Sequence, residues 1–90
     1  MKGGCDCGAV TLDIPGVPDR VNACPCGFCA KAGALWGYFP RDSVTVTGRT
    51  QVYRRASRRL EIHRCEECGI LTHWLEPTAR WPETGVNMRC

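Results

Sequence analysis

The stretch CDCGAVTLDI, residues 5 to 14, contains two signals that together decide the fold. Two cysteines separated by one residue are followed by a glycine, which is typical of a tight backbone turn around a metal ion. Val10, Leu12 and Ile14 then alternate with polar residues, and this period of two predicts a strand with one buried face. The start of the chain therefore predicts a β structure joined to a metal-binding turn.

The rest of the chain continues as short strands between turn residues. Further candidate strands cover residues 34–39, 44–47, 51–55, 59–65, 70–76 and 85–90. Two of them form a predicted hairpin with Val52, Leu60 and Ile62 facing inward. Only residues 28–33 are a candidate for one helical turn. We expect a single all-β, zinc-binding domain over residues 1–90, and its last strand, with no return strand or polar tail, is what a truncated C-terminus would look like.

Size and cysteine content favour metal binding over disulfides. A chain of this length buries only about 60–65% of its surface on folding, so its core alone is marginal. The first residues lack the apolar run of a secretory signal, and no apolar stretch is long enough to cross a membrane. We therefore expect a cytoplasmic protein without a membrane partner, in which cysteines bind metal instead of forming disulfides. Cysteines two residues apart are also near the distance limit for a disulfide.

The cysteines form three knuckles, at residues 5–8, 24–29 and 65–69, and each contains a glycine directly after a cysteine. If the first and third knuckles share one ion, it ties the two ends of the chain together through Cys5, Cys7, Cys65 and Cys68. The middle knuckle then supplies three sulfurs from one loop, Cys24, Cys26 and Cys29. Three protein ligands leave one zinc position open to water or substrate, unless the eighth cysteine, Cys90, closes the site.

Four other interpretations of the cysteines remain open at this point. C-x-x-C is also a thioredoxin-type redox motif, although no βαβ unit surrounds either copy. The chain could hold one zinc and several free buried cysteines, or a disulfide scaffold, which the missing signal sequence disfavours. The fourth alternative is a second structural zinc completed by Cys90.

Taken in order, these knuckles resemble the glutathione-dependent formaldehyde-activating family, which includes S-(hydroxymethyl)glutathione synthase-like proteins and is related to the centromere protein V group. The resemblance lies in GGCDCGAV at 3–10, CPCGFC at 24–29 and CEECG at 65–69, and it extends from Gly3 to Cys90. It implies a β-tent fold, in which two small antiparallel sheets lean together over zinc. One departure is Pro25, which stands where family members commonly carry a histidine and which cannot transfer a proton.

The resemblance also implies sites and an activity. A structural zinc would bind Cys5, Cys7, Cys65 and Cys68, and a second, catalytic zinc would bind Cys24, Cys26 and Cys29. The implied enzyme is a zinc-dependent carbon–sulfur lyase with two small-molecule partners, the thiol glutathione and an aldehyde, formaldehyde. It would join them as S-(hydroxymethyl)glutathione. The alternative is a zinc-stabilised binding module without chemistry.

Other residues are weaker candidates. His63 could reach a metal or act as an acid, but an exposed strand histidine is the favoured interpretation for it, and more so for His73. The arginines of RRASRR, residues 54–59, are expected at a solvated hairpin tip, with carboxylate binding as the alternative.

A nucleic-acid partner is not expected. Seven thiolates on two zinc ions would cancel the formal charge of +3, and only Tyr53 offers a stacking surface beside the arginines. The remaining aromatic strand residues are expected in the core, or as walls of a pocket over the second metal: Trp36, Tyr38, Phe39 and Trp74.

Overall fold

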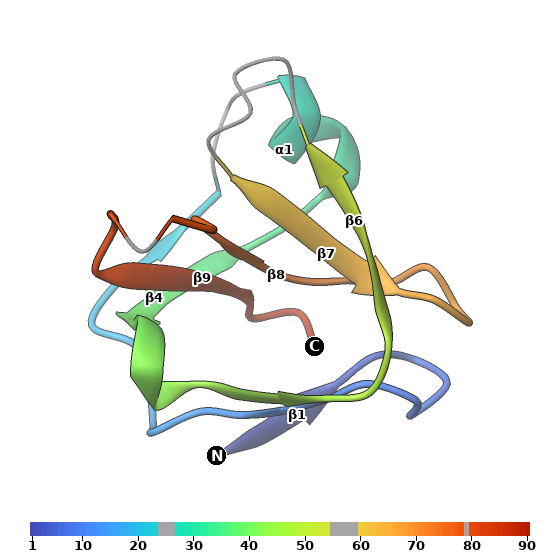
Figure 1. Cartoon of the computed structure of the whole chain (residues 1–90), viewed down its shortest axis with the longest axis horizontal. Coiled ribbons are helices and arrows are strands. Elements are labelled where there is room, and N and C mark those ends of the chain that lie inside the picture. Colours follow the sequence, from blue (N-terminus) through green and yellow to red (C-terminus); the bar gives the residue numbers. More distant parts are fainter. Residues whose placement is uncertain (24–26, 55–59, 79) are drawn as a thin grey trace.

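The computed structural model describes residues 1–23, 27–54, 60–78 and 80–90, which form two antiparallel sheets and very little helix (Figure 1). The small sheet has the order β1-β2-β5, with strands Lys2–Gly4, Thr11–Asp13 and Thr45–Thr47. The large sheet has the order β3-β4-β9-β8-β7-β6, with strands Val21–Asn22, Trp36–Pro40, Glu83–Asn87, Leu71–Leu75, Glu61–Cys65 and Thr50–Arg54. The expected all-β fold of two small antiparallel sheets is confirmed.

The two helical segments are short. Helix α1, Gly27–Ala32, is the single turn that the sequence predicts at 28–33, and the 3-10 helix η1, Arg41–Ser43, follows β4. Gly33 ends α1 with a φ of +68°, and its N–H donates to the Cys29 carbonyl at 3.0 Å. A positive φ at this position is the common way to stop a helix, because glycine adopts it without steric cost.

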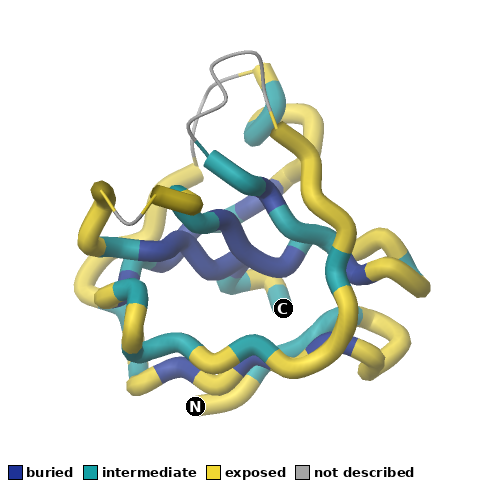
Figure 2. Tube along the Cα trace, viewed as in Figure 1, coloured by how far each residue is buried: buried dark blue, intermediate teal, exposed yellow. Residues whose placement is uncertain are grey.

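The inner face of the large sheet packs on the small sheet. Leu12 and Ile14, from the strand predicted by alternation, join Phe39 and Val86 in one buried cluster. Figure 2 shows that burial is concentrated along the central strands of the large sheet, while the loops at its margins are exposed. The alternation at the start of the chain is therefore the pattern that joins the two sheets.

The outer face of the large sheet carries a second cluster. Its buried members are Ala34, Trp36, Ile62 and Trp74, and α1 packs against them through Phe28 and Cys29. Strand register places Tyr38, Gly85, Trp74, Ile62 and Tyr53 side by side in one row across this face. One turn of helix thus covers only part of a face that has aromatic side chains along its length.

One expectation for the predicted hairpin is wrong. Strands β6 and β7 do pair, and Ile62 is buried, but Val52 is 43% exposed. Strand β6 is the edge of the large sheet, and its residues are exposed apart from the partly buried Thr50. An alternating pattern cannot show that a strand lies at an edge, where even the inward face reaches solvent.

Within the described residues, no helix is long and apolar enough to cross a membrane.

Gly85 gives a test of the outer-face packing. A Cβ at this position would lie 2.0 Å from Trp74 Nε1, because the indole lies directly over the glycine. We expect Gly85→Ala to displace the indole and lower the free energy of unfolding by about 1–3 kcal/mol. Urea denaturation measures the change. Gly16→Ala is the control, since no atom lies within 4 Å of its added methyl, and equal stability of the two variants would contradict the packing.

Candidate metal centre

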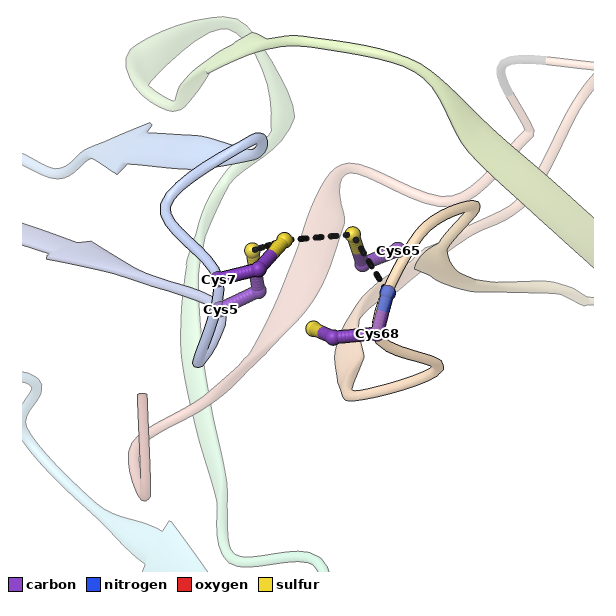
Figure 3. A group of neighbouring side chains, drawn as sticks. All are labelled: Cys5, Cys7, Cys65 and Cys68. Carbon is purple, nitrogen blue, oxygen red and sulfur yellow. Dashed lines mark hydrogen bonds between the residues drawn. The ribbon is translucent and has the colours of Figure 1, made fainter.

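Four cysteine sulfurs from two loops far apart in the sequence meet between the sheets. The sulfurs of Cys5, Cys7, Cys65 and Cys68 all lie within 4.8 Å of one another. Cys7 Sγ lies 3.7 Å from both Cys5 Sγ and Cys65 Sγ. Four sulfurs in a tetrahedron at about 2.3 Å from a zinc ion lie about 3.8 Å apart. Figure 3 shows the side chains pointing toward one common centre, so the donor set fits a zinc-like metal ion.

Each sheet contributes one pair of ligands. Cys5 and Cys7 lie in the loop between β1 and β2, while Cys65 ends β7 and Cys68 lies in the turn before β8. The glycines after these cysteines take the expected turn conformation, with φ of +83° at Gly8 and +78° at Gly69. The same expectation is wrong for Gly27, which begins helix α1 instead. The middle knuckle therefore differs from the other two because a helix follows it.

Backbone N–H groups surround the sulfurs. Val10 N donates to Cys5 Sγ at 3.3 Å, and the N–H groups of Glu67 and Cys68 donate to Cys65 Sγ at 3.3 and 3.4 Å. Such donors stabilise thiolates and hold the ligand side chains in place.

The pKa values of the clustered thiols are shifted in opposite directions, so the thiols do not all ionise at the same pH. The Val10 N–H lowers the pKa of Cys5, and the N–H groups of Cys7 and Ile70 lower the pKa of Cys68 to about 6. For Cys7, the N–H of Ala9 acts in the same direction, but burial and the neighbouring sulfurs raise the pKa to about 12. A divalent cation between the sulfurs would remove this repulsion and favour four thiolates.

The middle knuckle is described only in part. Cys24 and Cys26 lie outside the described residues, so a second zinc on Cys24, Cys26 and Cys29 stays a prediction. Cys29 lies on α1, and the indole N–H of Trp36 donates to its sulfur at 3.4 Å. The side chain of Cys29 thus lies against the outer face of the large sheet, away from the four-sulfur cluster between the sheets.

Cys90 packs against the buried apolar cluster between the two sheets. Its side chain packs with Leu12 and Val86 between the sheets, and its thiol donates to the Leu71 carbonyl at 3.4 Å. Burial, with the charges of Cys5 and Cys68, raises its pKa. This position argues against the alternative in which Cys90 closes the site of Cys29, which packs on the outer face.

The exposed-strand interpretation of both histidines is wrong. His63 and His73 are paired in register on the inner face, where their rings stack with centroids 4.3 Å apart, and His73 is only 4% exposed. Burial lowers the pKa of His73 to about 4 and also lowers that of His63. Both are neutral at pH 7, and threonine hydroxyls of Thr50 and Thr72 bond their Nδ1 atoms. Neither belongs to the four-sulfur cluster.

The arginine-rich tip is also described in part. Residues 55–59 lie outside the described residues, and Arg54 forms an ion pair with Glu61 across the hairpin. Of the aromatic residues, Trp36, Phe39 and Trp74 are buried in the core as expected, whereas Tyr38 is only partly buried.

A cleft of about 680 Å³ opens on the outer face, beside β3, the strand that precedes the middle knuckle. Its lining comprises Arg20, Val21, Asn22, Tyr38, Leu60, Trp74, Glu76, Trp81 and Glu83. The sequence pattern predicted Tyr38 and Trp74 as possible pocket walls, but it did not indicate Arg20, Glu76 or Trp81. One feature of the sequence could have indicated Trp81. It lies in a loop between Pro77 and Pro82, where a tryptophan is not expected to pack in the core.

Two small antiparallel sheets, with four cysteines between them that could hold a metal ion, define the class of this protein. The chain belongs to the glutathione-dependent formaldehyde-activating enzyme family, which matches residues 1–88. A crystal structure of a Rhodobacter sphaeroides protein is similar, with a TM-score of 0.83 and 29% identity over 99% of this chain and 85% of that chain. No curated protein matches.

Loss of one sulfur should unfold the domain. A metal that binds only the folded chain contributes directly to folding, and its contribution is comparable to the whole stability of a small domain. We expect Cys5→Ser to abolish cooperative thermal unfolding followed by circular dichroism, whereas Cys26→Ser, at a cysteine assigned to the other site, stays folded. Equal collapse of both variants would contradict this division between the two groups of cysteines.

Metal affinity should fall as the pH falls. Without metal, a Cys7 thiol with a pKa of about 12 is protonated at neutral pH, so metal binding displaces at least one proton. Each displaced proton changes the affinity about tenfold per pH unit. Competition for zinc with a chromophoric chelator should therefore show at least about 100-fold weaker binding at pH 6 than at pH 8, and pH-independent affinity would contradict the assignment.

Proposed function

We propose that this protein joins glutathione and formaldehyde to give S-(hydroxymethyl)glutathione, the reverse of a carbon–sulfur lyase reaction. Membership of the formaldehyde-activating family over residues 1–88 carries the proposal. We include two zinc ions in it, a structural one on Cys5, Cys7, Cys65 and Cys68 and a catalytic one on Cys24, Cys26 and Cys29. Cys5, Cys7, Cys65, Cys68 and Cys90 form no disulfide, which supports a reducing location such as the cytoplasm.

The chemistry requires a thiolate and a proton. In the reaction, the glutathione sulfur bonds to the formaldehyde carbon, the carbonyl π bond opens, and the thiol proton ends on oxygen. Cys24, Cys26 and Cys29 would hold the catalytic zinc ion, which would supply an open position and lower the pKa of a thiol bound there. Pro25 has no titratable group, so we expect solvent to supply the proton to the oxygen.

The chain's own contribution is to position Cys29. Helix α1 begins directly after Cys26, and the Trp36 indole N–H holds the Cys29 sulfur from the side of the sheet. Trp36 is itself only 3% exposed, so its ring is fixed by packing and the sulfur has little freedom to move. The cleft lies on the same face of the sheet as Cys29, and we propose that it holds the organic part of the substrate.

Exchange NMR between formaldehyde and glutathione tests the proposal. We expect the protein to accelerate exchange over the spontaneous reaction, and Cys29→Ser to remove at least about 90% of the acceleration while the domain stays folded. Cys90→Ser is the matched control, because Cys90 is also half-buried but packs between the sheets. No acceleration by the unmodified protein would refute the enzymatic proposal and leave a zinc-stabilised binding module.

A further inference from the structure

The cleft on the outer face has aromatic walls. Trp74 forms its floor over Gly85, and Tyr38 meets the Trp74 ring edge-on with centroids 6.2 Å apart. Trp81 adds a third ring at the margin and is 53% exposed. Three flat apolar surfaces around a volume of about 680 Å³ are typical of a site for an organic ligand much larger than formaldehyde.

The loop that carries Trp81 is fixed at both ends. The Arg41 guanidinium donates to the carbonyls of Glu76 and Trp81, at 3.0 and 3.3 Å. Within the loop, the Glu76 carboxylate accepts hydrogen bonds from the backbone N–H groups of Thr78 and Arg80, at 2.9 and 2.7 Å. The Thr78 hydroxyl, which also donates to this carboxylate, and these N–H groups lower the pKa of Glu76 to about 2. Trp81 is therefore an exposed ring whose own backbone carbonyl is held by Arg41, so little further entropy is lost when a ligand contacts it.

The charged residues at the cleft are already paired. Arg20 forms an ion pair with Glu83 at 3.2 Å and lies over the Tyr38 ring, 4.6 Å from its centroid. The Glu76 carboxylate is bonded within its own loop. Among the described residues of the lining, no unpaired cation is left for the carboxylates of glutathione. The cleft therefore fits an uncharged aromatic group better than it fits the tripeptide.

The cleft and Cys29 lie on the same face of the large sheet. Trp36, which bonds the Cys29 sulfur, and Tyr38, which lines the cleft, are two residues apart on β4. Side chains so spaced point to the same face, about 6.6–6.8 Å apart. Trp74 is common to both, because it lines the cleft and belongs to the cluster against which Cys29 packs. A ligand group in the cleft is thus adjacent to the predicted second metal site.

We propose that this cleft binds an aromatic group on the carbonyl carbon of the substrate, so that the protein acts on aromatic aldehydes. This inference rests on the proposed function and names its substrate class. The reaction is the same addition: the thiol sulfur bonds to the aldehyde carbon, the carbonyl π bond opens, the thiol proton moves to oxygen, and nothing is oxidised or reduced. The aromatic ring stays in the cleft while the reacting carbon lies toward Cys29.

The first test uses 2-naphthylmethanol, which has the ring but no reactive carbonyl, titrated against the zinc-loaded protein. We expect saturable binding in indole NMR signals, about tenfold weaker in Trp81→Ala and nearly restored in Trp81→Phe. Tyr53→Ala is the control, since Tyr53 is a similarly exposed aromatic residue that lines a different hollow beside α1. Absence of saturable binding, or loss of it in Tyr53→Ala alone, would overturn the proposal.

The second test links the cleft to the thiol reaction with two stable thioethers, S-benzylglutathione and S-methylglutathione. We expect the benzyl compound to bind at least about tenfold more tightly and Trp81→Ala to abolish the difference. Equal affinities in the unmodified protein would overturn the proposal. The two hypotheses fail separately: Trp81-dependent binding of both aromatic probes without any acceleration of formaldehyde–glutathione exchange would refute the reaction with formaldehyde and support the aromatic cleft.

Discussion

The four-sulfur junction is the contact on which the rest of the structure depends. A three-stranded sheet of short strands cannot bury enough apolar surface to be stable alone, and its core with the large sheet contains few residues. Cys5 and Cys7 come from the loop of one sheet, and Cys65 and Cys68 from the turn of the other. A metal ion at their centre would join residues about sixty positions apart, and so fix the position of the two sheets relative to each other.

With the small sheet held on one side, the two faces of the large sheet take different roles. The inner face contains the apolar contacts to the small sheet, the stacked histidines and Cys90. The outer face has one turn of helix over it and otherwise presents aromatic side chains and the cleft. The four-sulfur cluster and the proposed ligand cleft therefore lie on opposite sides of the large sheet. This separation explains why substitutions at the two groups of cysteines are expected to differ in their effects.

The histidines show how a buried polar pair can be accommodated without a metal. The Nδ1 atom of each ring forms a hydrogen bond with a threonine hydroxyl, and the rings stack on each other, whereas His63 Nε2 is buried without a hydrogen-bond partner among the described residues. Desolvation keeps both neutral, because the charged form would lose its hydration between the sheets. His63 lies two residues before Cys65, and in a regular strand the two side chains would face the same side, which is why His63 was a candidate to reach the metal. This expectation holds only where the strand is regular. A bulge follows directly at His63 and Arg64.

The sequence by itself determined the all-β class, the alternation of Val10, Leu12 and Ile14 toward the core, and the helical turn after the middle knuckle. These features depend on the local spacing of residues along the chain. The grouping of Cys5, Cys7, Cys65 and Cys68 was implied by the family resemblance, because no local spacing relates residues about sixty positions apart. The exposure of Val52, the burial of the histidines, the position of Cys90 and the aromatic cleft depended on the tertiary structure. Strand order decides which strand lies at an edge and which side chains meet across the sheet, and neither is encoded in the spacing of residues along one strand.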